Sequence, residues 1–279
     1  MLATRCGAKK VALRLVLPFV RDEVIRSPAA IVLAVTLQVF SVGAVQADAL
    51  LRVDGSWLRW QPSRTAQVVI TYALLTGPYT VPGNKSILSP SNCASMRAFS
   101  DIVRNSPKIS EAAAKRELNE AFAAWEQAAN LIFMESNDPR SANIVIGAQD
   151  IPEGKAFANL SYYGPRPIVP VSKSLGSSSL PSALAGSDAA GGESTAVRID
   201  QAYICLNPKE AWKIGFDGNL DVYDLRYTFT HEIGHAIGLD HPFGESALMA
   251  SRYDERVRTL QPSDIAAARR LYGPPLAGR

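Results

Sequence analysis

Histidine and cysteine are scarce in this sequence, and their scarcity limits the chemistry that it can support. The 279 residues include three histidines and three cysteines. All three histidines lie in one stretch of eleven residues, HEIGHAIGLDH, from His231 to His241. A second site built on histidine is therefore excluded, and any metal binding or proton transfer by imidazole belongs to this one segment.

The chain also lacks a large excess of charge of either sign. Its formal net charge is +3, and residues 1–47 carry six basic and two acidic residues. The remaining residues hold 23 basic and 24 acidic side chains. Because binding to nucleic acid needs a basic surface, we expect no nucleic-acid partner. With 47% hydrophobic and 20% charged residues, the composition is that of a globular protein.

Residues 1–47 are typical of an export signal. No charged residue occurs from Ser27 to Ala47, and the apolar run AAIVLAVTLQVF is followed by AVQADA. Val45 and Ala47 fit the small-residue pattern before a cleavage site. We predict cleavage after Ala47, which leaves residues 48–279 as a secreted or periplasmic bacterial protein. Because the uncharged stretch is long enough to span a bilayer, an N-terminal membrane anchor is the alternative.

Cleavage would leave two cysteines, Cys93 and Cys205. In an oxidising compartment an even pair can form a disulfide, and two buried free thiols are the alternative. Spacing in the sequence does not decide between them.

The apolar pattern predicts a single α+β domain with strands first and helices late. Strand-like segments occur at Gln67–Leu75, Ala142–Ala148, Gly154–Gly164 and Thr195–Leu206. Helices are predicted at Glu111–Asn130 with Ser110 as N-cap, from Asp221 or Asp224 to Gly238, and at Pro262–Tyr272. Residues 76–108 and the Ser/Gly-rich residues 172–195 have the composition of loops. We expect a cleft that divides the domain into two lobes.

The second predicted helix presents two imidazoles on one side. Leu225, Phe229, Ile233 and Ile237 repeat every fourth residue and form a stripe that faces the core. At about 100° per residue, His231 and His235 lie together on the opposite side, with Glu232 at the edge of the same polar arc.

Two imidazoles one helical turn apart can bind one divalent cation, and zinc is the cation that best fits nitrogen ligands. Gly238 can adopt the positive φ that turns the chain sharply at the end of the helix. The turn would bring His241 back as a third ligand. Three neutral nitrogens leave a fourth position for water, which is typical of a catalytic zinc.

Glu232 is the predicted catalytic residue. A zinc-bound water is acidic, and Glu232 can accept its proton as general base and pass it to a leaving amine. The pattern therefore predicts hydrolysis of a peptide bond without a covalent intermediate.

The motif HExxHxxGxxH resembles the zinc signature of the metzincin metallopeptidases, which also have a methionine turn beneath the metal. Met249, in ESALMASRY, resembles that methionine and would support the site together with Gly238. Residues 65–273 are most similar to the matrixin branch, although Pro242 after the third histidine resembles serralysins. Tyr253 has the matrixin spacing for a residue in the wall of the specificity pocket.

The resemblance implies a metzincin-like zinc peptidase domain. Its fold would be a twisted mixed sheet with three main helices and an active-site cleft. Residues 156–162 would form the edge strand on which an extended peptide lies. The expected cofactor is one catalytic zinc. The second, structural zinc of vertebrate matrixins is not expected, because no histidine remains to bind it.

Three further expectations concern ions and partners. Asp217, Asp221 and Asp224 could bind calcium, but loop carboxylates with a helix N-cap are the interpretation that we favour. The expected partner is a polypeptide substrate, with a membrane only if the leader is retained, and we expect a monomer. The alternatives are a membrane-tethered form of the same protease, or a metzincin-fold zinc hydrolase or binding protein that does not cleave polypeptide.

Overall fold

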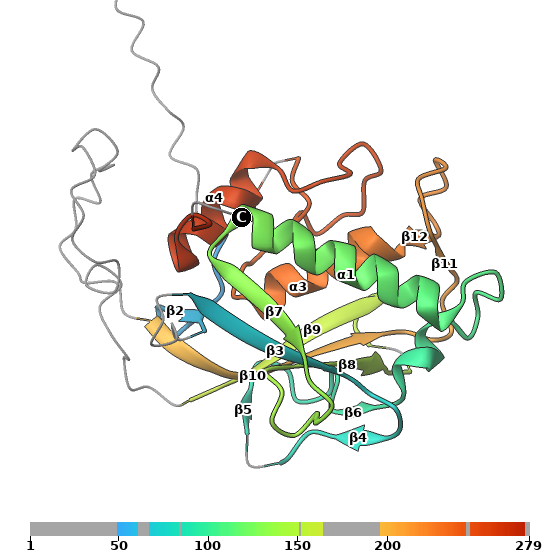
Figure 1. Ribbon diagram of the computed structural model, residues 1–279, viewed down its shortest axis with the longest axis horizontal. Coiled ribbons are helices and arrows are strands. Elements are labelled where there is room, and N and C mark those ends of the chain that lie inside the picture. The colour runs from blue at the N-terminus through green and yellow to red at the C-terminus, as the bar shows by residue number, and fades with distance from the viewer. Residues whose placement is uncertain are drawn as a thin grey trace, which may run out of the picture. The chain divides into compact units, whose positions relative to one another are not determined.

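A computed structural model describes residues 49–60, 67–83, 85–150, 152–163, 196–243 and 246–276 (Figure 1). The predicted leader at residues 1–47 and the Ser/Gly-rich residues 172–195 lie outside the described residues. The cleavage site and the alternative membrane anchor therefore stay predictions. Within the described ranges, none of the helices has both the length and the apolar character that crossing a membrane requires.

A mixed sheet forms the centre of the domain. Four strands run parallel in this order: β7 (Leu131–Glu135), β3 (Val68–Leu74), β8 (Ile144–Ala148) and β10 (Ala196–Leu206). Four more strands extend it: β9 (Ala156–Tyr162) antiparallel to β10, β5 (Ser86–Ile87) antiparallel to β9, β2 (Ser56–Arg59) parallel to the start of β10, and β1 (Arg52–Val53) antiparallel to β2. Every residue of β8 is buried, as expected of a central parallel strand.

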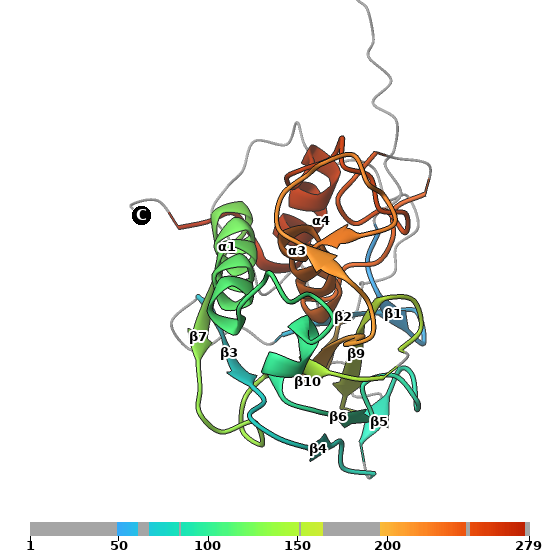
Figure 2. The same ribbon diagram turned by 90° about the vertical axis from the view of Figure 1, so that its right-hand side faces the viewer.

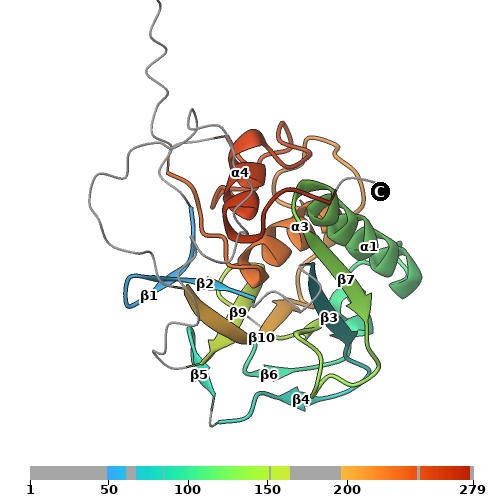
Figure 3. The same ribbon diagram turned by 60° about the vertical axis from the view of Figure 1, so that its left-hand side comes forward.

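Three helices lie on one face of this sheet, as the three views show (Figures 1, 2 and 3). They are α1 (Glu111–Ala128), α3 (Leu225–Ala236) and α4 (Pro262–Tyr272). The Ser110 hydroxyl accepts a hydrogen bond from the backbone N–H of Ala113 and so caps α1, as predicted. Fully buried Trp125 joins α1 to α3, because its indole N–H donates to the Thr230 carbonyl at 2.9 Å.

The mixed sheet and the three helices confirm the predicted α+β fold. α1 ends at Ala128, two residues before its predicted end, because Ala129 is already extended and the chain enters β7 at Leu131. The prediction of plain loop for residues 76–108 was wrong. This segment contains β4 (Tyr79–Thr80) paired with β6 (Ser95–Met96), together with β5 and the 3-10 helix η1 (Phe99–Val103).

An additional segment, residues 49–60, packs against the end of α3. The Leu51 N–H donates to the Gly238 carbonyl at 2.9 Å, and the Asp240 N–H donates to the Ala49 carbonyl at 2.8 Å. The Trp60 indole N–H donates to the Ala236 carbonyl at 3.0 Å. The segment just after the predicted cleavage site is therefore part of the folded domain, and its strands β1 and β2 and these contacts were not predicted from the sequence.

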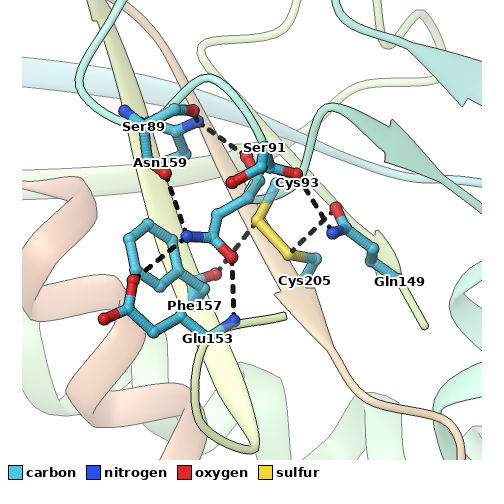
Figure 4. The surroundings of a disulfide bond; sticks show 9 residues. Ser89, Ser91, Cys93, Gln149, Glu153, Phe157, Asn159 and Cys205 are labelled. Atoms are coloured by element: carbon cyan, nitrogen blue, oxygen red, sulfur yellow. Dashed lines mark hydrogen bonds between the residues drawn. A yellow bond between two sulfur atoms is a disulfide. The ribbon is translucent and has the colours of Figure 1, made fainter. Parts of the chain in front are cut away.

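Cys93 and Cys205 form a disulfide, with their Cα atoms 5.5 Å apart and both side chains fully buried (Figure 4). It ties the loop after β5 to the end of β10. The side-chain amide of Asn159 on β9 fastens the same loop, since it donates to the Ser89 carbonyl at 2.6 Å and to the Asn92 carbonyl at 2.7 Å. Of the two alternatives for the cysteines, the disulfide is the one that the structure contains.

Candidate active site

The structure brings the three histidines together. His231 and His235 lie one turn apart on α3, and His241 follows the turn after the helix. The Nε2 atoms of His231 and His235 are 3.1 Å apart, and the Nε2 atom of His241 is 3.2 Å from each of them. These three nitrogens form a nearly equilateral triangle.

Backbone carbonyl groups hold the rings of His231 and His235 through their other nitrogen atom, Nδ1. The Nδ1 atom of His231 lies 2.9 Å from the Leu248 carbonyl oxygen, and that of His235 lies 2.9 Å from the Leu239 carbonyl oxygen. Because a carbonyl only accepts, each Nδ1 must carry the proton, which leaves Nε2 with a free lone pair. Two lone pairs therefore face each other at 3.1 Å.

This arrangement fits a zinc ion. Lone pairs that face one another repel unless a cation lies between them. Zinc–nitrogen bonds of about 2.0–2.1 Å in tetrahedral geometry place the nitrogens about 3.3 Å apart, close to the separations found here. Among the described residues, the three histidines are the cluster of potential ligands that lie close enough together to hold a metal ion.

Burial favours the neutral, metal-binding form of all three imidazoles. Desolvation lowers the pKa of His231 to about 4, against the 6.5 of a free imidazole. It also lowers the pKa of His235, well below the usual value, and that of the more exposed His241.

Gly238 makes the turn that returns His241 to the site. Its φ is +99°, in the left-handed region that glycine adopts without strain. A Cβ at this position would lie 2.3 Å from the Leu58 carbonyl oxygen on β2. The position therefore requires glycine for two independent reasons, and only the turn could be inferred from the sequence.

Met249 packs beneath the histidine-bearing turn of α3 and is 1% exposed. A Cβ on Gly234 would lie 2.2 Å from the Met249 sulfur, so the methionine fits against bare backbone between the two helical ligands. The sequence indicated Met249 but not that Gly234, inside the HExxH motif, is needed to admit it.

Asp264, which sequence reasoning missed, holds the methionine turn in place. It is 2% exposed, and its carboxylate accepts hydrogen bonds from the N–H groups of Leu248 at 3.0 Å and Met249 at 3.2 Å. It also accepts from the Gln261 N–H at 2.7 Å and completes the capping box of α4. An acid three residues after the N-cap was a visible signal for the cap, but not for this second role.

Glu232 lies beside the triangle of nitrogens and is 6% exposed. With the three histidines it lines a cavity of about 480 Å³. Burial raises the pKa of its carboxyl group to about 8, close to the range in which a group both accepts and donates protons at neutral pH.

The cavity is lined by residues of β9 and by a group of tyrosines, which we call the tyrosine wall. The residues of β9 are Ala156, Phe157, Ala158 and Leu160, and the tyrosines are Tyr223, Tyr227 and Tyr253. Tyr253 therefore lies in the pocket wall, where its matrixin-like spacing placed it. Its ring stacks on Tyr223 with centroids 4.3 Å apart.

Two of the three acids considered for calcium have other partners. Asp224 is the N-cap of α3 and accepts from the Tyr227 N–H at 2.8 Å. Asp217 forms an ion pair with Lys213. Both contacts match the favoured interpretation of loop carboxylates and a helix N-cap.

Comparisons with known proteins agree with this site. The matrixin family model matches residues 183–273, which include all three histidines and Met249. A probable matrix metalloproteinase of Invertebrate iridescent virus 3 is 27% identical over 56% of this chain and 36% of its own length. Matrix metalloproteinase-16 of Rattus norvegicus is 28% identical over 61% of this chain and 25% of its own length.

Matrix metalloproteinase-20 of Homo sapiens is 27% identical over 62% of this chain and 30% of its own length. The match thus spans about a quarter to a third of these relatives. The family match, the relatives and the fold together support a matrixin-like catalytic domain of the metzincin type in this chain.

Proposed function

We propose that this chain is an exported zinc-dependent endopeptidase that hydrolyses extended polypeptides. The observation that carries the proposal is the triangle of imidazole nitrogens, 3.1–3.2 Å apart, beside the buried Glu232 carboxyl group. His231, His235 and His241 would hold the zinc, which when bound supplies an acidic water and polarises the substrate carbonyl.

Glu232 performs the proton transfers in this proposal. It accepts a proton from the attacking water and later donates it to the amine that leaves. Burial raises the pKa of this carboxyl group, and the positive charge of a bound zinc would lower it toward the range in which the carboxylate can accept a proton at neutral pH. The two His Nδ1–H groups, bound to the Leu248 and Leu239 carbonyls, keep the ligand rings oriented throughout.

The substrate would lie along the free edge of β9. β5 pairs with Ser161 and Tyr162, and the Leu88 N–H donates to the Leu160 carbonyl at 3.0 Å. Among the described residues no strand covers that edge from Ala156 to Asn159. Because this stretch lines the cavity next to the histidines, an extended peptide could add there as a further strand.

The disulfide supports the proposal of export. Cys93 and Cys205 are joined behind β9, and disulfides persist in secreted and periplasmic proteins rather than in the cytosol. Mass spectrometry of the mature protein separates the two proposed forms. An N-terminus at Asp48 indicates cleavage, whereas an intact leader indicates the membrane-tethered form.

The activity is tested with purified protein of known zinc content and a reduced, alkylated protein as substrate. We expect one zinc per chain and cleavage by the wild type. Glu232→Ala should retain zinc and lose about 100-fold or more of kcat/KM, the scale of a lost general base.

The matched control is Glu120→Ala, because Glu120 is on α1 and its side chain is 61% exposed. This variant should cleave like the wild type. A zinc-loaded wild type that cleaves no polypeptide would favour the alternative of a non-peptide hydrolase or a binding protein. If Glu232→Ala were as active as the control, the assignment of the base would be wrong.

A further inference from the structure

A largely buried ion pair is hydrogen-bonded to the tyrosine wall of the cavity through Tyr253. The Lys213 ammonium is 2.5 Å from a carboxylate oxygen of Glu255, and the two side chains are only 12% and 8% exposed. Lys213 also contacts the Asp217 carboxylate and donates to the Asn219 carbonyl at 2.7 Å. One ammonium group therefore joins the loop before α3 to the segment after the methionine turn.

Glu255 transmits this contact to the wall. One of its carboxylate oxygens accepts a hydrogen bond from the Tyr253 hydroxyl at 3.1 Å, and the other accepts from the Gly218 N–H at 2.6 Å. The Tyr253 hydroxyl in turn accepts from the Asp224 N–H, at the start of α3, at 3.1 Å. The hydroxyl of Tyr253 is thus held from both sides.

Tyr253 is the central ring of the wall. It stacks on Tyr223 and meets Tyr227 edge to face, with the centroids of the second pair 4.7 Å apart. All three rings line the cavity that also contains Glu232. Moving Tyr253 would therefore change the shape of the space beside the reacting bond without contact to a histidine.

We propose that Lys213 and Glu255 are positioning residues that determine which substrate side chains the cavity accepts. The proposal rests on the proposed endopeptidase function. Neither residue lines the cavity, and both act through the Tyr253 ring. Without the Lys213 ammonium, the Glu255 carboxylate would be an unpaired buried charge, which is strongly unfavourable. It would turn toward water and release both Tyr253 and Gly218.

The zinc site should not depend on this ion pair. Its ligands are oriented by the Leu248 and Leu239 carbonyls, and Asp264 supports the methionine turn from α4. Loss of Lys213 should consequently alter selection between substrates while zinc content stays at the wild-type level.

The first test compares Lys213→Met with the control Lys209→Met. The Lys209 side chain is 59% exposed, and its ammonium lies 3.5 Å from the Asp150 carboxylate, so it makes a weaker contact than Lys213 does. Peptides are varied between alanine and phenylalanine at each position that flanks the cleaved bond. We expect the preference between the two side chains to fall about 10-fold in Lys213→Met, which corresponds to 1.4 kcal/mol. The loss should appear in KM for the preferred peptide, with kcat nearly unchanged, and the control should keep the wild-type preference.

A rescue variant separates positioning from general destabilisation. In Lys213→Met/Glu255→Gln the buried charge is gone and the glutamine oxygen still accepts from the Tyr253 hydroxyl, although its NH2 group cannot accept from the Gly218 N–H. This double variant should recover most of the lost preference. If Lys213→Met does not fold, Tyr253→Phe gives the same test, because it removes only the hydroxyl that Glu255 and Asp224 bind.

Hydrogen exchange provides a measurement that does not depend on activity. In Lys213→Met the amides of Gly218 and Asp224 should exchange faster, while those of Leu248 and Met249 stay protected. If these amides exchange faster in Lys213→Met but the wild type cleaves no peptide, the proposed endopeptidase activity is contradicted. The role of the ion pair in holding Tyr253 is then still supported. A folded, zinc-loaded Lys213→Met with wild-type preference and wild-type exchange would overturn the positioning role, as would an unchanged preference in Tyr253→Phe.

Discussion

At the scale of single residues, two glycines allow the active-site helix to be approached closely on two sides. Gly234 admits the Met249 sulfur from below, and Gly238 admits the Leu58 carbonyl while it turns the chain. At both positions the glycine hydrogen atom fits, whereas a methyl group would clash with the neighbouring atom. The positions of the proposed zinc ligands therefore depend on two residues that have no side chain.

Gly238→Ala should destabilise the protein by about 2–4 kcal/mol. Alanine in the left-handed region costs roughly 1–2 kcal/mol, and its Cβ would meet the Leu58 carbonyl. Urea denaturation measures the change in the free energy of unfolding. Gly77→Ala is the control, because a Cβ there has no neighbour within 4 Å. Equal stability of the two variants would show that β2 yields easily and that the turn tolerates a side chain.

The histidines and Glu232 could be predicted from the sequence because their relation is local. A spacing of four residues on a helix and one glycine turn decide where His231, His235 and His241 lie. Gly234 and Asp264 could not be found in this way. Each acts through a partner about fifteen residues or more away in the chain, and spacing within a motif does not reveal such contacts.

At the scale of elements, α4 supports the site although it carries none of the proposed ligands. Asp264 at its first turn binds the N–H groups of Leu248 and Met249, and the Leu248 carbonyl then orients His231. The start of one helix is thereby coupled to a ligand on another through a single turn of backbone. Contacts of this kind around metal ligands commonly affect affinity.

Asp264→Ala should weaken zinc binding by about 10–100-fold, the usual effect of removing a group that orients a ligand. It should also lower stability by about 2–4 kcal/mol, since buried N–H groups lose their acceptor. Competition with a coloured chelator measures the zinc affinity. The control is Asp150→Ala, because the Asp150 side chain is 44% exposed and its ion pairs among the described residues are with Arg97 and Lys209. Zinc affinity equal to that of the control would show that the methionine turn holds its shape unaided.

Predictability also differed between kinds of element. The helices α1, α3 and α4 and the strands β3, β8, β9 and β10 have an apolar pattern that extends over five residues or more, so the sequence indicated them. β1, β4, β5 and β6 are two residues long and show no period. Their pairing depends on the strands beside them, as β5 depends on the end of β9, and a local pattern does not contain that information.

At the scale of the whole domain, two connections join parts of the chain that are far apart in sequence. Residues 49–60 bind the end of α3, and the disulfide spans 112 residues between Cys93 and Cys205. The covalent connection ends at Cys205 on β10, which pairs with β9, the strand proposed to bind the substrate, whereas the proposed zinc ligands belong to α3 and the turn after it. The substrate edge and the metal site are therefore stabilised by separate contacts.

Cys93→Ala/Cys205→Ala should unfold at lower urea concentration and still bind zinc. A crosslink that closes a loop of about 100 residues removes enough entropy from the unfolded chain to contribute roughly 2–5 kcal/mol. The variant should fold, because Asn159 still binds the carbonyls of Ser89 and Asn92.

Treating the wild type with a dithiol reductant, which reduces the disulfide to two thiols, should lower its stability to a similar level and leave the variant unaffected. A loss below about 0.5 kcal/mol would mean that the hydrogen bonds alone hold this loop against β9. Loss of zinc from the folded variant would instead show that the substrate edge and the metal site are coupled through β10.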